Sequence, residues 1–344
     1  PYNAVIVDEA SMMDLLLTEA LLRALKPGTR LIFVGDRDQL PSVGAGNVLS
    51  DMIESEYFQV TKLNRIYRQG SDSEIISNAH RVNKGEYPGY EEVKGDSVPE
   101  SDFLLYRLDK QDDIANMILD VSSHFDSNDV QVLTPVKKGK LGTAELNDRL
   151  HEIFNPKTEE KDEIPFGKKY FRVGDRVMQI KNNYRILYMA FADSSFALSN
   201  NPLQSLALKD IAENREVREG QGVFNGEIGI VTAVDKKKRS VTVIYDNERY
   251  VEYEYTDLDE IEHAYAITIH KSQGSEFPVV VIPMSWFPPV ISTRSLIYTG
   301  ITRGKEKVMI VGNPEYMNAM VDNNESGRRN SGLRYRLSSL LFGV

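Results

Sequence analysis

Residues 5–14, "VIVDEASMMD", place two adjacent carboxylates directly after a short apolar run. A run of this length that contains β-branched side chains is typical of a buried strand in a parallel sheet. Residues 12–30 then show helical periodicity, and residues 30–36, "RLIFVGD", form a second apolar run. The sequence therefore predicts a β–α–β unit in which Asp8 and Asp36 stand at neighbouring strand ends.

The composition is that of a globular protein, with 344 residues, 41% hydrophobic and 27% charged, a net charge of −10 and no cysteine. This length favours two or three domains. The lack of cysteine excludes a disulfide framework or a thiolate metal site. No apolar run is long enough to span a membrane and no signal peptide is visible, so we expect a cytoplasmic protein without a membrane partner.

The next part of the chain alternates between strand-like and helix-like segments. We expect a strand at residues 57–63, "YFQVTKL", and then a helix that is capped by Ser71 or Asp72 and ends near Lys84. Further alternation up to about residue 163 predicts a second α/β domain.

The pattern then changes between about Ile164 and Asp259, where short strands are separated by turn signals such as "DKKKR" and "DNE". This pattern predicts a small β-barrel inserted into the second α/β domain, because apolar α/β segments return after it. Residues 184–222, within the barrel, mix several patterns and receive no assignment.

The residues at the first strand ends have the chemistry of nucleotide hydrolysis. Of Asp8 and Glu9, one carboxylate can hold Mg²⁺ while the other orients and deprotonates the attacking water. Residues 35–46, "GDRDQLPSVGAG", bring Asp36 and Gln39 to the same edge of the sheet, where α/β proteins bind ligands. Taken alone, each pattern also fits a solvated loop; together they favour a nucleotide site.

Six segments in this order resemble the motifs of superfamily 1 (1B) DNA helicases of the RecD-like group. That group includes the exodeoxyribonuclease V alpha subunit and stand-alone RecD-like helicases. The resemblance runs from about Val5 to Gly312. Its segments are "VIVDEAS", "LIFVGDRDQLPSVGAG", "IYRQ", "VLTPVKKGKLGTAELN", "AITIHKSQGSEF" and "LIYTGITRGKEKV".

The resemblance implies an α/β fold of RecA-like P-loop helicase domains with a Src-homology-3-like barrel. Residues 1–60 would be a remnant of domain 1A with motifs II and III. Residues 61–163 and 260–344 would form domain 2A with motifs IV, V and VI, and residues 164–259 the inserted barrel, domain 2B. The phosphate-cradling G-x-x-x-x-G-K-[ST] loop is not found, so we expect it before Pro1 and expect this chain by itself to be an inactive C-terminal fragment.

The resemblance also implies roles in ATP hydrolysis. Asp8 would hold Mg²⁺, Glu9 would be the catalytic base and Gln39 the γ-phosphate sensor. Arg68 matches the arginine of motif IV, and Arg303 matches the arginine finger of motif VI. The cofactors implied are ATP and Mg²⁺.

Motif V and one loop are expected to contact the two ligands. The residues expected to approach the nucleotide are Asp36, Gly274 and Glu276. The residues expected to face single-stranded DNA are Thr134, Pro135, Lys137, Lys138, Thr268, His270, Lys271 and Ser272. Lys140 belongs to the same loop as Lys137, and a solvated run of charges is the alternative interpretation of that loop.

The function expected from the resemblance is that of an ATP-dependent DNA helicase that translocates on single-stranded DNA, with 5′–3′ polarity, in DNA repair or recombination. Three alternatives stay open. The protein could be the alpha subunit of a helicase–nuclease complex, with nuclease or helicase subunits as partners. It could also be the helicase half of a conjugative relaxase, or a nucleic-acid-binding module without catalysis.

Overall fold

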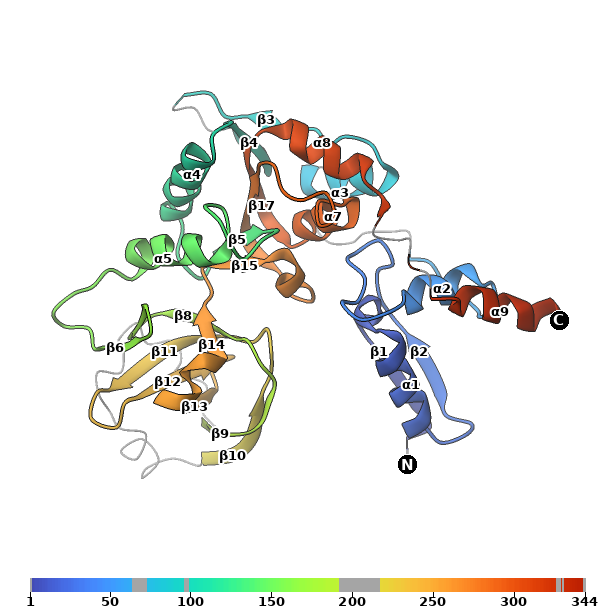
Figure 1. The fold of residues 1–344 in the computed structure, drawn as a ribbon, viewed down its shortest axis with the longest axis horizontal. Coiled ribbons are helices and arrows are strands. Elements are labelled where there is room, and N and C mark those ends of the chain that lie inside the picture. The colour runs from blue at the N-terminus through green and yellow to red at the C-terminus, as the bar shows by residue number, and fades with distance from the viewer. Residues whose placement is uncertain are drawn as a thin grey trace. The chain divides into compact units, whose positions relative to one another are not determined.

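The computed structural model describes residues 2–63, 73–95, 99–191, 217–325, 329 and 331–342. The chain folds into two compact units (Figure 1). The first consists of Pro1–Lys110 and Ser272–Val344, and the second of Gln111–Lys271. None of the helices in these described ranges has the length and hydrophobicity needed to span a lipid bilayer.

The first unit begins with the predicted β–α–β arrangement. Its elements are β1 (Ala4–Val7), η1 (Ala10–Met12), α1 (Leu15–Ala24) and β2 (Arg30–Phe33). The two strands pair in parallel, which confirms that prediction. Asp14 caps α1 by accepting a hydrogen bond from Leu17 N at 2.7 Å. The predicted burial is wrong, because each strand has only the other as a partner among the described residues, and Ile6 is 67% exposed.

A parallel sheet forms the core of the first unit. Its strands lie in the order β16, β17, β4 and β3, with every neighbouring pair parallel. Their bounds are β16 (Phe277–Met284), β17 (Gly304–Gly312), β4 (Phe103–Arg107) and β3 (Glu91–Glu92). The apolar run of β16 is almost entirely buried, as expected of a strand covered on both faces.

The further helices described in this unit are α2 (Val48–Glu54), α3 (Glu74–Lys84), α7 (Arg294–Ile301), α8 (Pro314–Asp322) and α9 (Leu333–Phe342). Helices α3, α7 and α8 pack on the parallel sheet, and α2 contacts η1. Helix α3 packs against α7, and α9 packs against α2 (Figure 1).

Two local predictions in this unit need correction or qualification. Residues 57–63 form no strand, since no neighbouring strand pairs with them, and Tyr57 instead packs edge-to-face on Phe58. Helix α3 begins at Glu74, and its first amide donates to Asp102 Oδ1 at 3.0 Å, so its cap comes from a distant residue. The caps expected at residues 71 and 72 lie outside the described residues.

In its described residues, the second unit combines two helices with short strands. Its α/β elements are α4 (Gln111–Ser123), β5 (Val130–Thr134), α5 (Thr143–Phe154) and β15 (Ala266–Thr268). Strands β5 and β15 are parallel, with Thr134 opposite Thr268, and α5 packs on β15. The 3₁₀ turn η4 (Ile269–Ser272) follows β15.

The remaining strands of this unit pair in antiparallel fashion, and most of them lie within residues 164–259, where short strands are predicted. Strands β6 (Glu163–Phe166) and β7 (Lys169–Arg172) pair with each other. The larger sheet has the order β10, β9, β13, β12, β11, β8 and β14 among the described residues. Its bounds are β8 (Arg176–Gln179), β9 (Asn183–Phe191), β10 (Val217–Val223), β11 (Ile228–Asp235), β12 (Ser240–Tyr245), β13 (Arg249–Glu254) and β14 (Ile261–His263), with the 3₁₀ turn η3 (Tyr255–Glu260) before β14.

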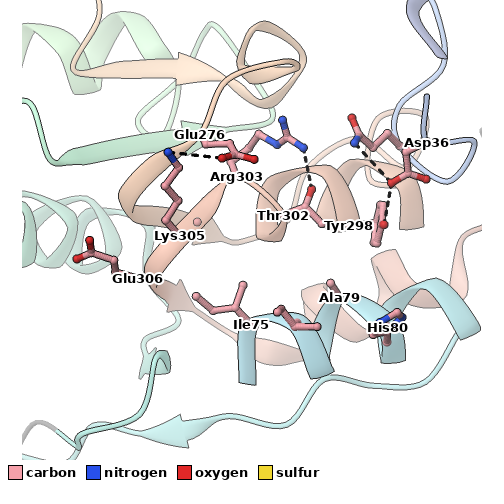
Figure 2. A pocket seen from close by; sticks show the side chains of 13 residues that line it. Asp36, Ile75, Ala79, His80, Glu276, Tyr298, Thr302, Arg303, Lys305 and Glu306 are labelled. Carbon is pink, nitrogen blue, oxygen red and sulfur yellow. Dashed lines mark hydrogen bonds and ion pairs between the residues drawn. The ribbon is translucent and has the colours of Figure 1, made fainter. Parts of the chain in front are cut away.

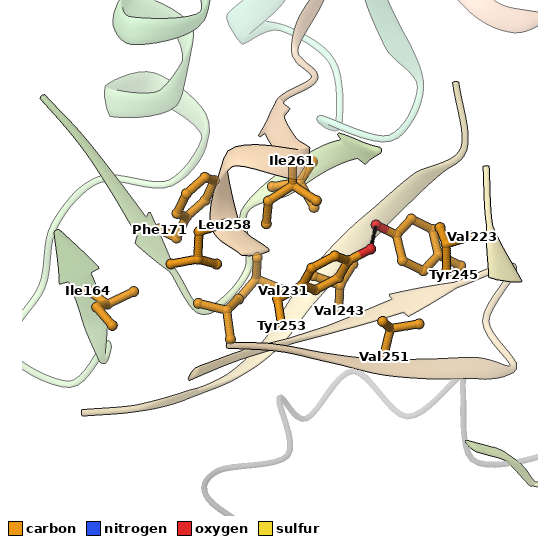
Figure 3. Close-up of a cluster of buried hydrophobic side chains, with 12 residues drawn as sticks. Ile164, Phe171, Val223, Val231, Val243, Tyr245, Val251, Tyr253, Leu258 and Ile261 are labelled. Atoms are coloured by element: carbon orange, nitrogen blue, oxygen red, sulfur yellow. Dashed lines mark hydrogen bonds between the residues drawn. The ribbon is translucent and has the colours of Figure 1, made fainter. Parts of the chain in front are cut away.

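The core of the antiparallel sheet is an apolar cluster that contains one polar pair (Figure 3). The hydroxyls of Tyr245 and Tyr253 lie 2.8 Å apart, and Tyr253 donates to Gln179 Oε1 at 2.8 Å. In the stretch without a sequence assignment, β9 and β10 form an antiparallel pair. Residues 192–216, between these two strands, lie outside the described part of the chain.

Candidate functional site

The two adjacent carboxylates lie at the end of β1, beside the loop that follows β2. Ala10 N donates to Val34 O at 2.9 Å, which holds the two chain segments together. Glu9 has a left-handed backbone with φ of 50°, and its amide donates to Asp8 Oδ1 at 2.8 Å. A left-handed conformation costs a residue with a side chain about 1–2 kcal/mol. The surrounding contacts must offset this cost, and they thereby set the orientation of Glu9 relative to the exposed Asp8.

A pocket of about 660 Å³ lies in the same unit (Figure 2). One wall is largely apolar and belongs to α3, whereas the other walls are polar and come from the loop after β2, from α7 and from the start of β17. The lining residues are Asp36, Gln39, Ile75, Ile76, Ala79, His80, Glu276, Tyr298, Thr302, Arg303, Gly304, Lys305 and Glu306. Four residues expected to touch the nucleotide therefore share one pocket.

Hydrogen bonds join the loop after β2 to α7. Asp36 Oδ2 accepts from Tyr298 OH at 2.8 Å and from Gln39 Nε2 at 3.5 Å. Leu40 N donates to Thr299 Oγ1 at 3.0 Å. Burial, followed by the charge of Asp36, raises the pKa of Tyr298, so its hydroxyl stays protonated and can donate.

Motif V lies against the same loop. Gln273 Nε2 donates to the carbonyl oxygen of Leu40 at 2.8 Å. The next residue, Gly274, has φ of +76°, a conformation that favours glycine. Glu276 lies 3.5 Å from the Lys305 ammonium, and both side chains line the pocket.

Arg303 is held rigidly at the edge of the pocket. Only 5% of this residue is exposed. Its guanidinium donates to the carbonyl oxygens of Thr299 and Ser275, at 3.2 and 2.9 Å, and to Thr302 Oγ1 at 3.2 Å. This set of contacts orients the planar group. The second expected arginine, Arg68, lies outside the described residues.

The residues expected to bind DNA belong mostly to the second unit. Thr134 is buried at the end of β5 and donates to Leu141 O at 2.6 Å, which closes the lysine loop. Lys137, Thr268 and Lys271 line one small hollow of about 20 Å³. Burial lowers the pKa of Lys271, the charge of Glu262 raises it, and Lys137 lowers it further.

The other expected DNA contacts are less uniform. Lys138 is exposed, whereas Lys140 forms an ion pair with Asp112 at 2.7 Å. Pro135 is buried, and burial lowers the pKa of His270. Ser272 is buried and belongs to the first unit.

A buried polar cluster in the second unit has no counterpart in the sequence predictions. His151, Asp175 and His263 offer ligand atoms that lie within 4.8 Å of one another, a composition that could hold a metal ion. The carboxylate of Asp175, however, already accepts hydrogen bonds from Asn155 Nδ2 at 2.5 Å and Arg172 N at 2.7 Å. The two imidazole rings contact each other, with centroids 4.2 Å apart and an interplanar angle of 31°. These contacts favour a structural hydrogen-bonded cluster.

The sequence predictions also missed Tyr298, Gln273 and the apolar wall on α3. Tyr298 lies in the quoted segment "LIYTGITRG", but its partner Asp36 is 262 positions away. No local pattern signals such a contact.

Three family models match parts of the chain. Residues 1–96 match a model described as an AAA domain. Residues 146–245 match the ATP-dependent RecD-like DNA helicase SH3 domain, and residues 263–311 the UvrD-like helicase C-terminal domain. With the parallel and antiparallel sheets described above, these matches confirm the expected RecA-like α/β fold with a Src-homology-3-like domain.

Similar proteins of known identity cover most of the chain. An ATP-dependent RecD2 DNA helicase of Deinococcus radiodurans is 30% identical over 312 residues, which are 91% of this chain and 36% of that protein. The RecBCD enzyme subunit RecD of Mycobacterium tuberculosis is 28% identical, over 98% of this chain and 54% of that protein. The chain thus spans between about a third and about a half of the length of these relatives.

A solved structure shares the fold. The crystal structure of a Pif1 helicase from Bacteroides, in complex with ADP-AlF3 and ssDNA, matches with a TM-score of 0.52 and 20% sequence identity. The match covers 94% of this chain and 73% of the Pif1 chain.

Proposed function

We propose that the full-length protein is an ATP-dependent DNA helicase acting on single-stranded DNA. The proposal starts from the membership of this chain in the RecD-like group of superfamily 1 helicases. The observation that carries the proposal is the pocket of Figure 2, because Gln39 and Arg303 both line it. A neutral sensor and a cation in one pocket suit a triphosphate, whose charge must be stabilised during phosphoryl transfer. The Deinococcus relative is an ATP-dependent DNA helicase by name.

The chain's own residues would divide the chemistry of hydrolysis. Asp8 is an exposed carboxylate at a strand end, the hard oxygen ligand that Mg²⁺ prefers, so it would hold the ion. The bound Mg²⁺ would neutralise charge on the phosphates. Glu9 would take the proton of the attacking water, and Gln39 would contact the γ-phosphate. Arg303, with Arg68 as the second expected arginine, would stabilise the charge of the transferring group.

The second unit would supply contacts to the DNA backbone. Lys137 and Lys271 line one hollow with Thr268, and cations with hydroxyls are the usual partners of backbone phosphates. The Pif1 structure contains ssDNA, which supports single-stranded DNA as the ligand. We propose 5′–3′ translocation, a role in DNA repair or recombination and a cytoplasmic location. The domain bounds expected from the sequence stay a prediction.

The test is Glu9→Gln in the full-length protein, measured as ATP hydrolysis with and without single-stranded DNA. Loss of the general base should lower the DNA-stimulated rate about 100-fold or more, while ATP binding persists. Glu19→Gln, on the exposed side of α1, is the matched control and should keep the wild-type rate. A wild type without DNA-stimulated hydrolysis, or Glu9→Gln equal to wild type, would instead favour a nucleic-acid-binding module without catalysis.

A second candidate is the alpha subunit of a helicase–nuclease complex. The Mycobacterium relative, matched over 98% of this chain, is by name a subunit of the RecBCD enzyme. Gel filtration of the full-length protein with nuclease and helicase subunits from the same source distinguishes a complex subunit from a stand-alone helicase. Co-elution would support a subunit, and separate elution of an active helicase would support a stand-alone enzyme.

A further inference from the structure

The inference concerns the carboxylate of Asp36, whose two oxygens are both engaged. Oδ1 accepts from Asp38 N at 2.9 Å, and Oδ2 accepts from Tyr298 OH at 2.8 Å. Gln39 Nε2 reaches the same Oδ2 only at 3.5 Å, the outer limit of a hydrogen bond. Tyr298 thus occupies the better position on Asp36, and the amide of Gln39 is held weakly.

The other end of the Gln39 amide is the oxygen Oε1. This atom is buried and has no hydrogen-bond partner in the described part of the chain. The side chain lines the pocket, so a rotation of the amide would turn this oxygen toward a donor bound there. A weakly held amide nitrogen and an uncommitted oxygen together allow the side chain to change partners, which a phosphate sensor requires.

The same turn of α7 is connected to Arg303. Thr299, next to Tyr298, accepts from Leu40 N through its hydroxyl, at 3.0 Å. The carbonyl oxygen of Thr299 accepts from Arg303 Nε at 3.2 Å. Tyr298 and Thr299 therefore fasten the loop of Gln39 on one side and the guanidinium of Arg303 on the other.

We propose that Tyr298 is a positioning residue of the nucleotide site. Through its hydrogen bond to Asp36, it holds the loop of Gln39 against α7 and fixes the distance between Gln39 and Arg303. Its hydroxyl is engaged by Asp36, so the role proposed for it is to position Gln39 and Arg303. The inference rests on the proposed function, because it assigns Gln39 and Arg303 to the same triphosphate.

The test is Tyr298→Phe in the full-length protein, with steady-state ATP hydrolysis measured on saturating single-stranded DNA. Loss of a hydrogen bond to a charged acceptor should lower kcat about tenfold. KM for ATP should stay within about twofold, because no contact to bound ATP is removed. Tyr316→Phe on α8 is the matched control and should leave both values unchanged. Thermal unfolding of both variants separates positioning from a general loss of stability.

A second variant tests the partner. If Tyr298 acts through Asp36, Asp36→Ala and the double variant should have nearly the same kcat, since alanine has no oxygen that could accept the hydrogen bond. Losses that multiply would overturn the inference, as would an active wild type whose kcat Tyr298→Phe leaves unchanged. A fall in kcat that is fully explained by a lower unfolding temperature of the variant would also overturn the inference. A wild type without DNA-stimulated hydrolysis would overturn the proposed function itself.

Discussion

Replacing Asp175 with asparagine is expected to destabilise the second unit by about 3 kcal/mol. The residue is fully buried and accepts hydrogen bonds from Asn155, Arg172 N and His263, the last at 3.1 Å. His151 Nε2 lies 2.7 Å from the other carboxylate oxygen. An asparagine side chain has one acceptor oxygen in place of two. Its NH₂ group would face one of the groups that now donate to the carboxylate. Breaking a buried charged network from one side costs roughly 3–5 kcal/mol.

The expected change in unfolding temperature follows from this loss. In a folding unit of 150–250 residues, 1 kcal/mol shifts Tm by about 2–4 °C, so about 3 kcal/mol corresponds to roughly 6–12 °C. Thermal unfolding followed by circular dichroism measures the shift. Asp148→Asn, an exposed position on α5, is the control and should stay within about 0.5 kcal/mol of wild type.

The same cluster predicts the direction of a pH dependence. Burial lowers the pKa of His263 below its ordinary value. Burial would raise the pKa of Asp175, but the adjacent imidazoles of His151 and His263 outweigh this effect and hold the pKa of Asp175 well below the usual range. In both cases the unfolded chain binds protons more readily than the folded chain, so stability falls on acidification. Titration of His263 should lower the free energy of unfolding below about pH 6.5, and titration of Asp175 should lower it below about pH 4.

The cluster argument would be refuted by either of two results. One is an Asp175→Asn variant with a Tm within about 2 °C of wild type at pH 7. The other is a wild type and variant whose unfolding free energies change in parallel below about pH 4, where only the wild type has the Asp175 carboxyl group to protonate.

Two further predictions concern the second unit. Replacing Lys137 and Lys138 together by alanine should weaken single-stranded DNA binding and make the slope of log K against log salt concentration shallower by about 1.4. Lys140→Ala is the control and should leave the slope unchanged, because the Lys140 cation is paired with Asp112. Fluorescence anisotropy at several salt concentrations measures the slope. Tyr253→Phe should cost about 1–3 kcal/mol in chemical unfolding, because the buried Gln179 Oε1 loses its donor. An unchanged slope for the double variant, or an unchanged midpoint for the tyrosine variant, would contradict the respective prediction.

Strand and helix positions could be predicted wherever a local pattern sets them. The strands β1 and β2 and the helix α1 between them lie where the sequence predicts them. The strand expected at residues 57–63 fails because a strand requires a neighbour, which composition does not supply. The burial of β1 fails for the same reason, since burial depends on what packs over a strand.

The candidate site was predictable in its motif residues but not in the contacts between them. Asp36, Gln39, Glu276 and Arg303 were expected from motifs, and the structure places all four at one pocket. Their roles in catalysis stay a prediction. The sequence could not distinguish Tyr298 from the other residues of α7, several of which face the core. Only the fold brings its hydroxyl to Asp36.

The loop that carries Gln39 is completed by residues from near the other end of the sequence. Arg329 donates to the carbonyl oxygens of Gly44 and Gly46, at 2.6 and 3.1 Å, across 285 and 283 positions of chain. Contacts of such sequence separation form late, because the intervening chain must first be made and ordered. During synthesis on the ribosome, this loop therefore stays without its final hydrogen bonds until Arg329 has emerged.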